Sequence, residues 1–158
     1  MKKFFMKKEA TIPFTKEGYQ KVLEEKVKLL SERPEAVEHL TKSRQMGDLS
    51  ENGYYKASRA KLSFLDARIR RVERLVRLGR IVESSGKGMV EIGSHVTLTH
   101  GNTQYEYNVV GGYESDPSKK TISHISPIGR ALMGKKKNDS IEVQAPAGRK
   151  TYTIVEVS

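Results

Sequence analysis

Between Tyr55 and Val76 the chain repeats a pattern every seven residues, and this repeat restricts the fold more than any other feature. The first position of the repeat holds Tyr55, Leu62, Ile69 and Val76. A second position is filled by Ser58, Leu65 and Val72. Such spacing is typical of the a and d positions of a coiled coil. The sequence therefore predicts a long helix that needs a partner helix along one seam.

The stretch from Thr15 onward supplies a candidate for that partner. Thr15 is a residue type that caps helix N-termini. Pro34 removes one backbone donor and crowds the turn before it, so we expect the helix to bend or to restart after Arg33. The apolar residues that define the expected inner face recur at three- and four-residue steps: Tyr19, Leu23, Val27, Leu30, Val37 and Leu40.

Only a few polar residues join the two helical stretches. Helices with a short connection pack as antiparallel neighbours, so we expect a coiled-coil hairpin. Each arm of about 30 residues, rising about 1.5 Å per residue, would extend roughly 45 Å. Such an arm is too long to fold back onto a domain of this size.

Beyond Gly79 the pattern changes to short segments with alternating polarity. We expect a short helix over 127–133, with Ser126 as N-cap, Pro127 at its first position and Gly134 as its stop. The expected strands are Met89–Ile92, His95–His100, Tyr105–Val110, Ser140–Gln144 and Lys150–Val157.

The predicted fold class is therefore α+β, with an N-terminal antiparallel helical hairpin and a small C-terminal antiparallel sheet domain carrying one helix. We assign 1–12 to a disordered basic tail and 13–82 to the hairpin with an acidic tip. We assign 83–88 to a linker and 89–158 to the C-terminal domain.

The positive charge of the chain is concentrated in the hairpin. The 158 residues carry 29 Lys and Arg against 19 Asp and Glu, a net charge of +10. Residues 56–80 hold nine of the basic residues, with Asp66 and Glu73 as their acidic counterparts. A cationic stripe of this kind favours nucleic acid as a partner. The alternative is a solvated helix face, which usually interleaves both signs of charge.

Composition also restricts the compartment. Cysteine is absent, which excludes a disulfide framework and thiolate metal sites and fits a reducing compartment. The apolar runs are too short for a signal peptide or a membrane span. We therefore expect a cytoplasmic protein without a membrane partner.

Two acids, Asp48 and Glu51, lie where the hairpin must reverse. In one interpretation they form a capping box, with Asp48 as N-cap of the second helix and Glu51 three residues later. In the other, two carboxylates held far from any core serve as metal ligands. Sequence alone leaves both interpretations open.

Two motifs in the chain resemble those of the GreA/GreB family of bacterial transcript cleavage factors. The first is Gly-Asp-Leu-Ser-Glu-Asn at 47–52, followed by an aromatic residue at 55. The second is Ile-Ser-His-Ile-Ser-Pro-Ile-Gly-Arg-Ala-Leu-Met-Gly-Lys at 122–135. The resemblance extends over about residues 13–158 and implies an FKBP-like fold for the C-terminal domain.

The resemblance also implies a function. Family members insert the hairpin into the secondary channel of RNA polymerase and stimulate its Mg²⁺-dependent cleavage of backtracked RNA. Asp48 and Glu51 would then help to hold an Mg²⁺ shared with the polymerase, and Ser50, Asn52 and Tyr55 would support them. Tyr55 is equally compatible with a seam position of the coiled coil. The chain would be an accessory factor and not itself a nuclease.

Further contacts follow from the charge pattern and from the resemblance. The partners implied are RNA polymerase and nascent RNA; DNA is compatible with the charge, and we expect a monomer. We expect RNA phosphate contacts from Lys61, Arg68 and Arg71. We expect polymerase contacts from Ser126, Pro127 and Arg130.

One residue departs from the family pattern. Tyr54 stands where family members commonly have an acid. An inhibitory channel binder without cleavage activity is therefore one alternative. A nucleic-acid-binding coiled-coil protein that acts away from the polymerase is a second.

Overall fold

The computed structural model describes residues 10–47 and 52–158. The chain forms two compact units. One comprises the residues up to Tyr19 together with Gly79–Ser158, and the other is Gln20–Leu78. Of the predicted tail, 1–9 lies outside the described residues, whereas Ile12 belongs to a strand.

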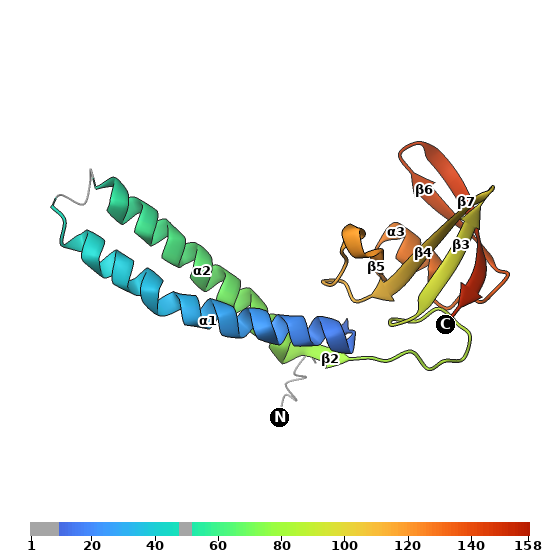
Figure 1. Cartoon of the computed structure of the whole chain (residues 1–158), viewed down its shortest axis with the longest axis horizontal. Coiled ribbons are helices and arrows are strands. Elements are labelled where there is room, and N and C mark those ends of the chain that lie inside the picture. The colour runs from blue at the N-terminus through green and yellow to red at the C-terminus, as the bar shows by residue number, and fades with distance from the viewer. Residues whose placement is uncertain (1–9, 48–51) are drawn as a thin grey trace, which may run out of the picture. The chain divides into compact units, whose positions relative to one another are not determined.

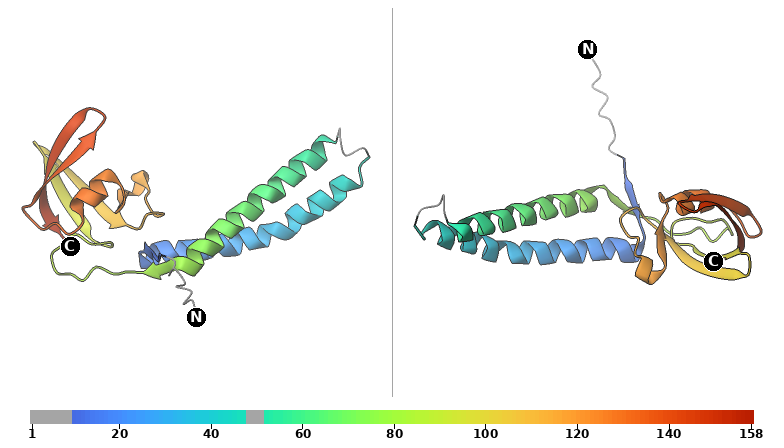
Figure 2. Two further views of the ribbon diagram at one scale, coloured as in Figure 1. Left: turned by 180° about the vertical axis from the view of Figure 1, so that it is seen from behind. Right: turned by 90° about the horizontal axis from the view of Figure 1, so that it is seen from above.

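The hairpin consists of two long helices, α1 (Lys16–Arg44) and α2 (Gly53–Leu78), which lie side by side and run antiparallel (Figures 1 and 2). Thr15 caps α1 as predicted, because its Oγ1 accepts a hydrogen bond from the Gly18 N–H at 3.0 Å. Of the two outcomes predicted at Pro34, the restart is wrong, since α1 continues through it, and the bend stays a prediction. Pro34 and Leu30, whose carbonyl loses its partner, are both exposed, so water can replace the missing bond.

The seam of α2 is confirmed. Every second-position residue of the predicted repeat is buried, as is Ile69. Towards the C-terminal end of the helix the seam continues through two leucines that the predicted repeat does not include. The buried residues of α2 are Ser58, Leu65, Ile69, Val72, Leu75 and Leu78.

The predicted inner face of α1 is wrong at three of its positions. The side chains of Val27, Leu30 and Val37 are 69%, 42% and 37% exposed. The buried residues are instead spaced by sevens along a neighbouring stripe: Val22, Leu29, Ala36 and Ser43. Two members of this stripe are small, and small seam residues are covered completely by a closely packed partner helix. The predicted inner face was defined by large apolar residues, and for this reason it missed the buried stripe.

A short parallel pair of strands, which the sequence did not predict, lies at the base of α1. Strand β1 (Ile12–Phe14) pairs with β2 (Gly79–Ile81). Phe14 is fully buried, and its ring meets that of Tyr19 edge-on with centroids 5.9 Å apart. The start of α1 and the end of α2 are thus tied together.

The C-terminal sheet has the strand order β5-β4-β3-β7-β6. Its neighbours pair antiparallel, except that β5 runs parallel to β4. Helix α3 (Pro127–Leu132) follows β5 and packs against β5 and β6. The strands are β3 (His95–His100), β4 (Thr103–Val110), β5 (Thr121–Ser123), β6 (Ser140–Ala145) and β7 (Gly148–Val157).

The core of this unit joins one face of the sheet to α3, which confirms the predicted α+β class. It is built from Val90, Val96, Leu98, Val109, Leu132, Ile141 and Ile154. The predicted strand Met89–Ile92 is wrong. Met89 makes an isolated bridge to Lys136, and Val90 exchanges backbone bonds with Gly134 and Lys135. Its alternating burial comes from a loop docked on the core.

No helix among the described residues is long and apolar enough to cross a membrane.

Candidate functional site at the hairpin tip

Asn52 joins the two helices at the tip of the hairpin. Its Oδ1 accepts a hydrogen bond from the Tyr55 N–H at 3.0 Å, which caps the start of α2. Its Nδ2 donates to the carbonyl oxygens of Ser43 at 2.8 Å and Met46 at 3.1 Å. Helix ends leave backbone groups without partners. One amide side chain therefore supplies an acceptor to α2 and donors to the end of α1.

This geometry decides part of the question about the tip acids. The cap position of α2 is occupied by Asn52, so the interpretation in which Asp48 is the N-cap of α2 is wrong. Asp48, Ser50 and Glu51 themselves lie outside the described residues. Their assignment to a metal site stays a prediction.

The two tyrosines that follow have different surroundings. Tyr55 is half-buried at the end of the seam, which fits its predicted seam position and leaves its supporting role a prediction. Tyr54 is 40% exposed and lies across from α1. Its hydroxyl oxygen is 2.6 Å from His39 Nδ1, and His39 Nε2 is 3.3 Å from Glu35 Oε1. A polar chain thus links the first turn of α2 to α1.

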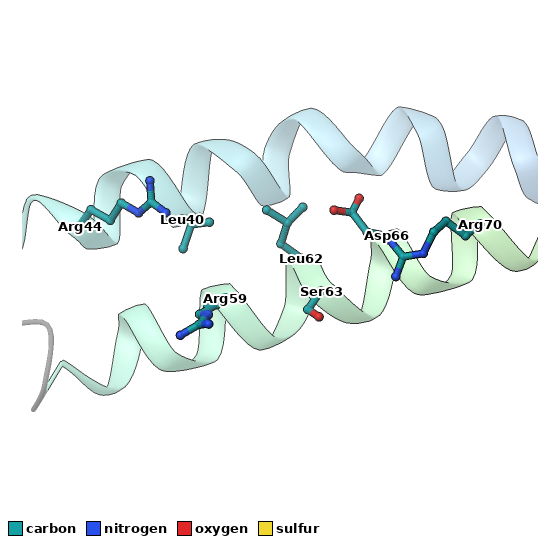
Figure 3. A pocket seen from close by; sticks show the side chains of 7 residues that line it. All are labelled: Leu40, Arg44, Arg59, Leu62, Ser63, Asp66 and Arg70. Carbon is teal, nitrogen blue, oxygen red and sulfur yellow. The ribbon is translucent and has the colours of Figure 1, made fainter.

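Below the tip, the facing sides of the two helices form a groove with a volume of 290 Å³. Leu40 of α1 and Leu62 of α2 point into the space between the helices (Figure 3). We call this feature the basic groove, because three arginines contribute to its walls. Its lining residues are Leu40, Arg44, Arg59, Leu62, Ser63, Asp66 and Arg70.

The charges of the basic groove are unbalanced. Asp66 forms an ion pair with Arg33 of α1, with 2.8 Å between Arg33 Nε and Asp66 Oδ1. The hydrogen bond from Arg33 lowers the pKa of the Asp66 carboxyl, and the charges of Arg33 and Arg70 act in the same direction. Within the described residues, Arg44 and Arg59 have no ion pair. The groove therefore presents cationic donors above an apolar floor, an arrangement suited to phosphate.

Sequence reasoning missed these arginines. Arg59, Ser63, Asp66 and Arg70 follow one another at four- and three-residue steps, so they share a face of α2. That spacing was a usable signal. Arg44 could not have been assigned to the groove, since its place depends on how α1 meets α2.

The predicted RNA contacts lie outside this groove. Lys61 and Arg71 are exposed on α2. Arg68 donates to Glu25 of α1 at 2.6 Å, although its side chain remains 49% exposed. The structure does not bring these three residues together with the groove arginines, and their contact with RNA stays a prediction.

The predicted polymerase contacts surround the start of α3. Ser126 is its N-cap, because its Oγ accepts from the Gly129 N–H at 3.1 Å and donates to the Ser123 carbonyl at 2.7 Å. This hydroxyl is already used within the fold. Pro127 and Arg130 are exposed, so they remain available for the predicted contact.

Among the described residues, no group of three or more His, Asp or Glu side chains could hold a metal ion. The predicted metal ligands Asp48 and Glu51 lie outside those residues.

Two family models together match most of the chain. Residues 12–81 match the model for the N-terminal domain of transcription elongation factors, and 85–158 match the GreA/GreB C-terminal model. A transcription elongation factor GreA from Lactococcus lactis subsp. cremoris is 41% identical over 94% of this chain and 99% of its own length. The corresponding factor of Cereibacter sphaeroides is 38% identical over 92% of this chain and 96% of its own length.

Among solved structures, GreA factor homolog 1 of Thermus thermophilus is 22% identical with a TM-score of 0.45 and covers 94% of this chain and 99% of that one. A GreA/GreB elongation factor from Nitrosomonas europaea is 23% identical with a TM-score of 0.42, covering 65% of this chain and 92% of that one. The family models and the curated relatives decide the assignment: the chain belongs to the GreA/GreB family of transcription elongation factors.

Proposed function

We propose that this protein enters the secondary channel of bacterial RNA polymerase with its hairpin and stimulates the Mg²⁺-dependent cleavage of backtracked RNA by the polymerase. Arrested complexes would thereby be rescued. The protein acts as an accessory factor in this proposal, and the polymerase remains the nuclease.

The Asn52 bonds are the observation that carries the proposal. They tie the Ser43 carbonyl of α1 and the Met46 carbonyl just after this helix to the first turn of α2. Asp48 and Glu51 follow Met46 and precede Asn52 in the sequence. A long hairpin whose two helix ends are joined in this way can present side chains to the active site of another protein.

The donor set of the tip fits magnesium. Mg²⁺ prefers oxygen ligands and usually binds through one or two protein carboxylates, with phosphate and water completing its shell. Asp48 and Glu51 supply two carboxylates, and the polymerase and the RNA would supply the rest. When bound, the ion would activate a water molecule and stabilise the leaving oxygen. Asp48 and Glu51 would hold and orient it.

The basic groove supports the same proposal. Phosphate contacts position a nucleic acid without reading its sequence. Arg44 and Arg59 have no ion pair within the described residues, and Leu40 and Leu62 provide an apolar floor. We assign the groove to the extruded RNA 3′ segment, in addition to the contacts predicted for Lys61, Arg68 and Arg71.

The test is a cleavage assay on a stalled, backtracked polymerase complex with 3′-labelled RNA and Mg²⁺. Wild type is expected to release short 3′ fragments far faster than the complex alone. Release at the unassisted rate, with binding to polymerase intact, would support the inhibitory alternative instead. Failure to co-elute with core polymerase at moderate salt would support action away from the polymerase.

A second experiment tests the basic groove. Arg59→Gln should raise the factor concentration needed for half-maximal cleavage and weaken its dependence on salt, because one phosphate contact is lost. Arg149→Gln is the matched control, since Arg149 is exposed on β7 of the other unit. Equal salt dependence of the two variants would exclude the groove from RNA contact.

A further inference from the structure

Three side chains beside the tip form a continuous hydrogen-bonded chain across the hairpin. Tyr54 Oη lies 2.6 Å from His39 Nδ1, and His39 Nε2 lies 3.3 Å from Glu35 Oε1. The rings of His39 and Tyr54 meet edge-on at 84°, with centroids 6.2 Å apart. Both rings are partly exposed, so the chain is open to solvent and to a partner.

The Glu35 carboxylate selects one neutral form of His39. A carboxylate accepts hydrogen bonds and cannot donate them. The imidazole therefore places its proton on Nε2, towards Glu35, and leaves Nδ1 as an acceptor. The short contact to Tyr54 is then a bond donated by the phenol. In this form the Tyr54 hydroxyl donates its hydrogen bond to His39 and cannot donate to another molecule.

Protonation of His39 reverses the direction of that bond. Both ring nitrogens of an imidazolium are donors. Nδ1–H must then donate to Tyr54 Oη, which turns its own proton away from His39. One proton taken up from solvent by the imidazole thus frees one O–H donor on Tyr54, and no other group changes charge.

The acceptor for this donor follows from the proposed function, which brings RNA to the tip; the charges of Glu35, Glu38 and Lys42 are balanced once His39 is protonated. On α1, Lys42 forms a 2.6 Å ion pair with Glu38. The hydrogen bond and charge of Glu38 are the main causes that raise the pKa of Lys42, and the Tyr54 phenol acts in the same direction. The pKa of Glu38 is lowered first by Lys42 and to a smaller extent by His39. Within the described residues, the charged groups that contact His39 or interact electrostatically with His39 or Tyr54 are Glu35, Glu38 and Lys42.

We propose that His39, oriented by Glu35, sets the hydrogen-bonding role of Tyr54, so that the tip offers an anionic oxygen of the RNA backbone a donor that depends on protonation. His39 is then a positioning residue, and Tyr54 is the group that meets the RNA. The idea rests on the cleavage function proposed above, and it assigns a role to the position where family members commonly have an acid.

The chain itself is tested on the free protein by nitrogen-detected NMR of the histidine rings. His39→Phe identifies the His39 signals among those of the four histidines. In its neutral form, which a pH series identifies, His39 is expected to carry its proton on Nε2, and Tyr54→Phe is expected to shift its Nδ1 resonance by removing the donated bond. A proton on Nδ1, or an Nδ1 resonance unaffected by Tyr54→Phe, would overturn the proposal.

The consequence for cleavage is measured with saturating factor, comparing maximal rates of wild type and Tyr54→Phe. Well below the pH at which the NMR series shows His39 to lose its proton, the variant should be about fivefold slower, the change expected from losing one hydrogen bond, whereas well above that pH the two should differ less than twofold. His39→Phe should lose the pH dependence of this ratio. His39→Asn, whose amide can bond to Tyr54 but takes up no proton in this pH range, should likewise show a ratio that does not change with pH.

Tyr105→Phe, which removes a hydroxyl in the sheet domain, is the matched control and should leave the rate ratio constant. A ratio for Tyr54→Phe that does not change with pH while wild type cleaves would refute the proton-dependent donor. If wild type releases no fragments, the proposed function fails, and the NMR measurement still decides whether the chain of hydrogen bonds exists.

Discussion

Removing the Asn52 side chain should weaken the hairpin by an amount that follows from its bonds. Asn52→Ala deletes an N-cap, which contributes about 1 kcal/mol. It also deletes two hydrogen bonds, to the Ser43 carbonyl of α1 and to the Met46 carbonyl just after it, each contributing about 0.5 kcal/mol net at a partly exposed site. The free energy of unfolding should therefore fall by about 2 kcal/mol.

The assay is urea unfolding followed by circular dichroism at a helix-sensitive wavelength. The midpoint should fall while the slope with urea stays constant, because the surface exposed on unfolding does not change. Asn52→Asp separates the two contributions. It keeps the capping oxygen but has no donor for the Ser43 and Met46 carbonyls, so it should cost about 1 kcal/mol or more.

Asn102→Ala, at an exposed turn between β3 and β4, is the matched control and should stay within about 0.5 kcal/mol of wild type. If Asn52→Ala were as stable as this control, the Asn52 bonds would not hold the ends of the two helices together, and this support for the proposed function would fail.

Three further predictions concern the packing and charge of the fold. Leu29→Ala should destabilise the hairpin by about 2–4 kcal/mol in the same urea assay, because Leu29 is 2% exposed. Leu30→Ala, the same change at an exposed neighbour, should cost under about 1 kcal/mol. Equal costs would favour the stripe predicted from the sequence of α1. Gly129→Ala should lower stability by about 1–3 kcal/mol, since a Cβ there would overlap the Ser123 carbonyl oxygen, and an unchanged thermal midpoint would contradict this close approach. The hydrogen bond from Arg33 is the first cause of the lowered pKa of Asp66 in the folded state. This shift adds stability above about pH 4 that is lost as pH falls through the folded pKa. Asp66→Asn should therefore make the free energy of unfolding depend less on pH on the acid side, and a dependence parallel to that of wild type would refute the assignment.

How far the sequence predicted this fold depended on the size of the residues involved. The α2 seam was readable because Leu65, Ile69 and Val72 are large and repeat regularly. The α1 seam was not, because Ala36 and Ser43 are buried through close helix approach rather than through their own apolar area. Long strands showed their period of two, but three-residue strands such as β1 and β5 are too short to show it.

The candidate site, too, could be predicted only in part. Asn52 was predicted as a supporting polar group, but its place as the cap of α2 depends on where the helix begins, and nearby acids competed for that assignment. The basic groove and the Tyr54–His39 bond combine residues from both helices. The α1 residues of both features could not be assigned before the rotation of α1 about its axis was known, because the predicted stripe was wrong at three of its positions.

The central claim is that the tip acids act in cleavage, and the most direct measurement compares Asp48→Asn and Glu51→Gln with wild type on a backtracked polymerase complex. These changes remove charge and retain shape. Factor should be added at saturating concentration, with its affinity for the complex measured in parallel. The account predicts that both variants bind as wild type does while fragment release falls by at least about tenfold, equivalent to about 1.4 kcal/mol of barrier. Wild-type rates of release by both variants at saturation would contradict it.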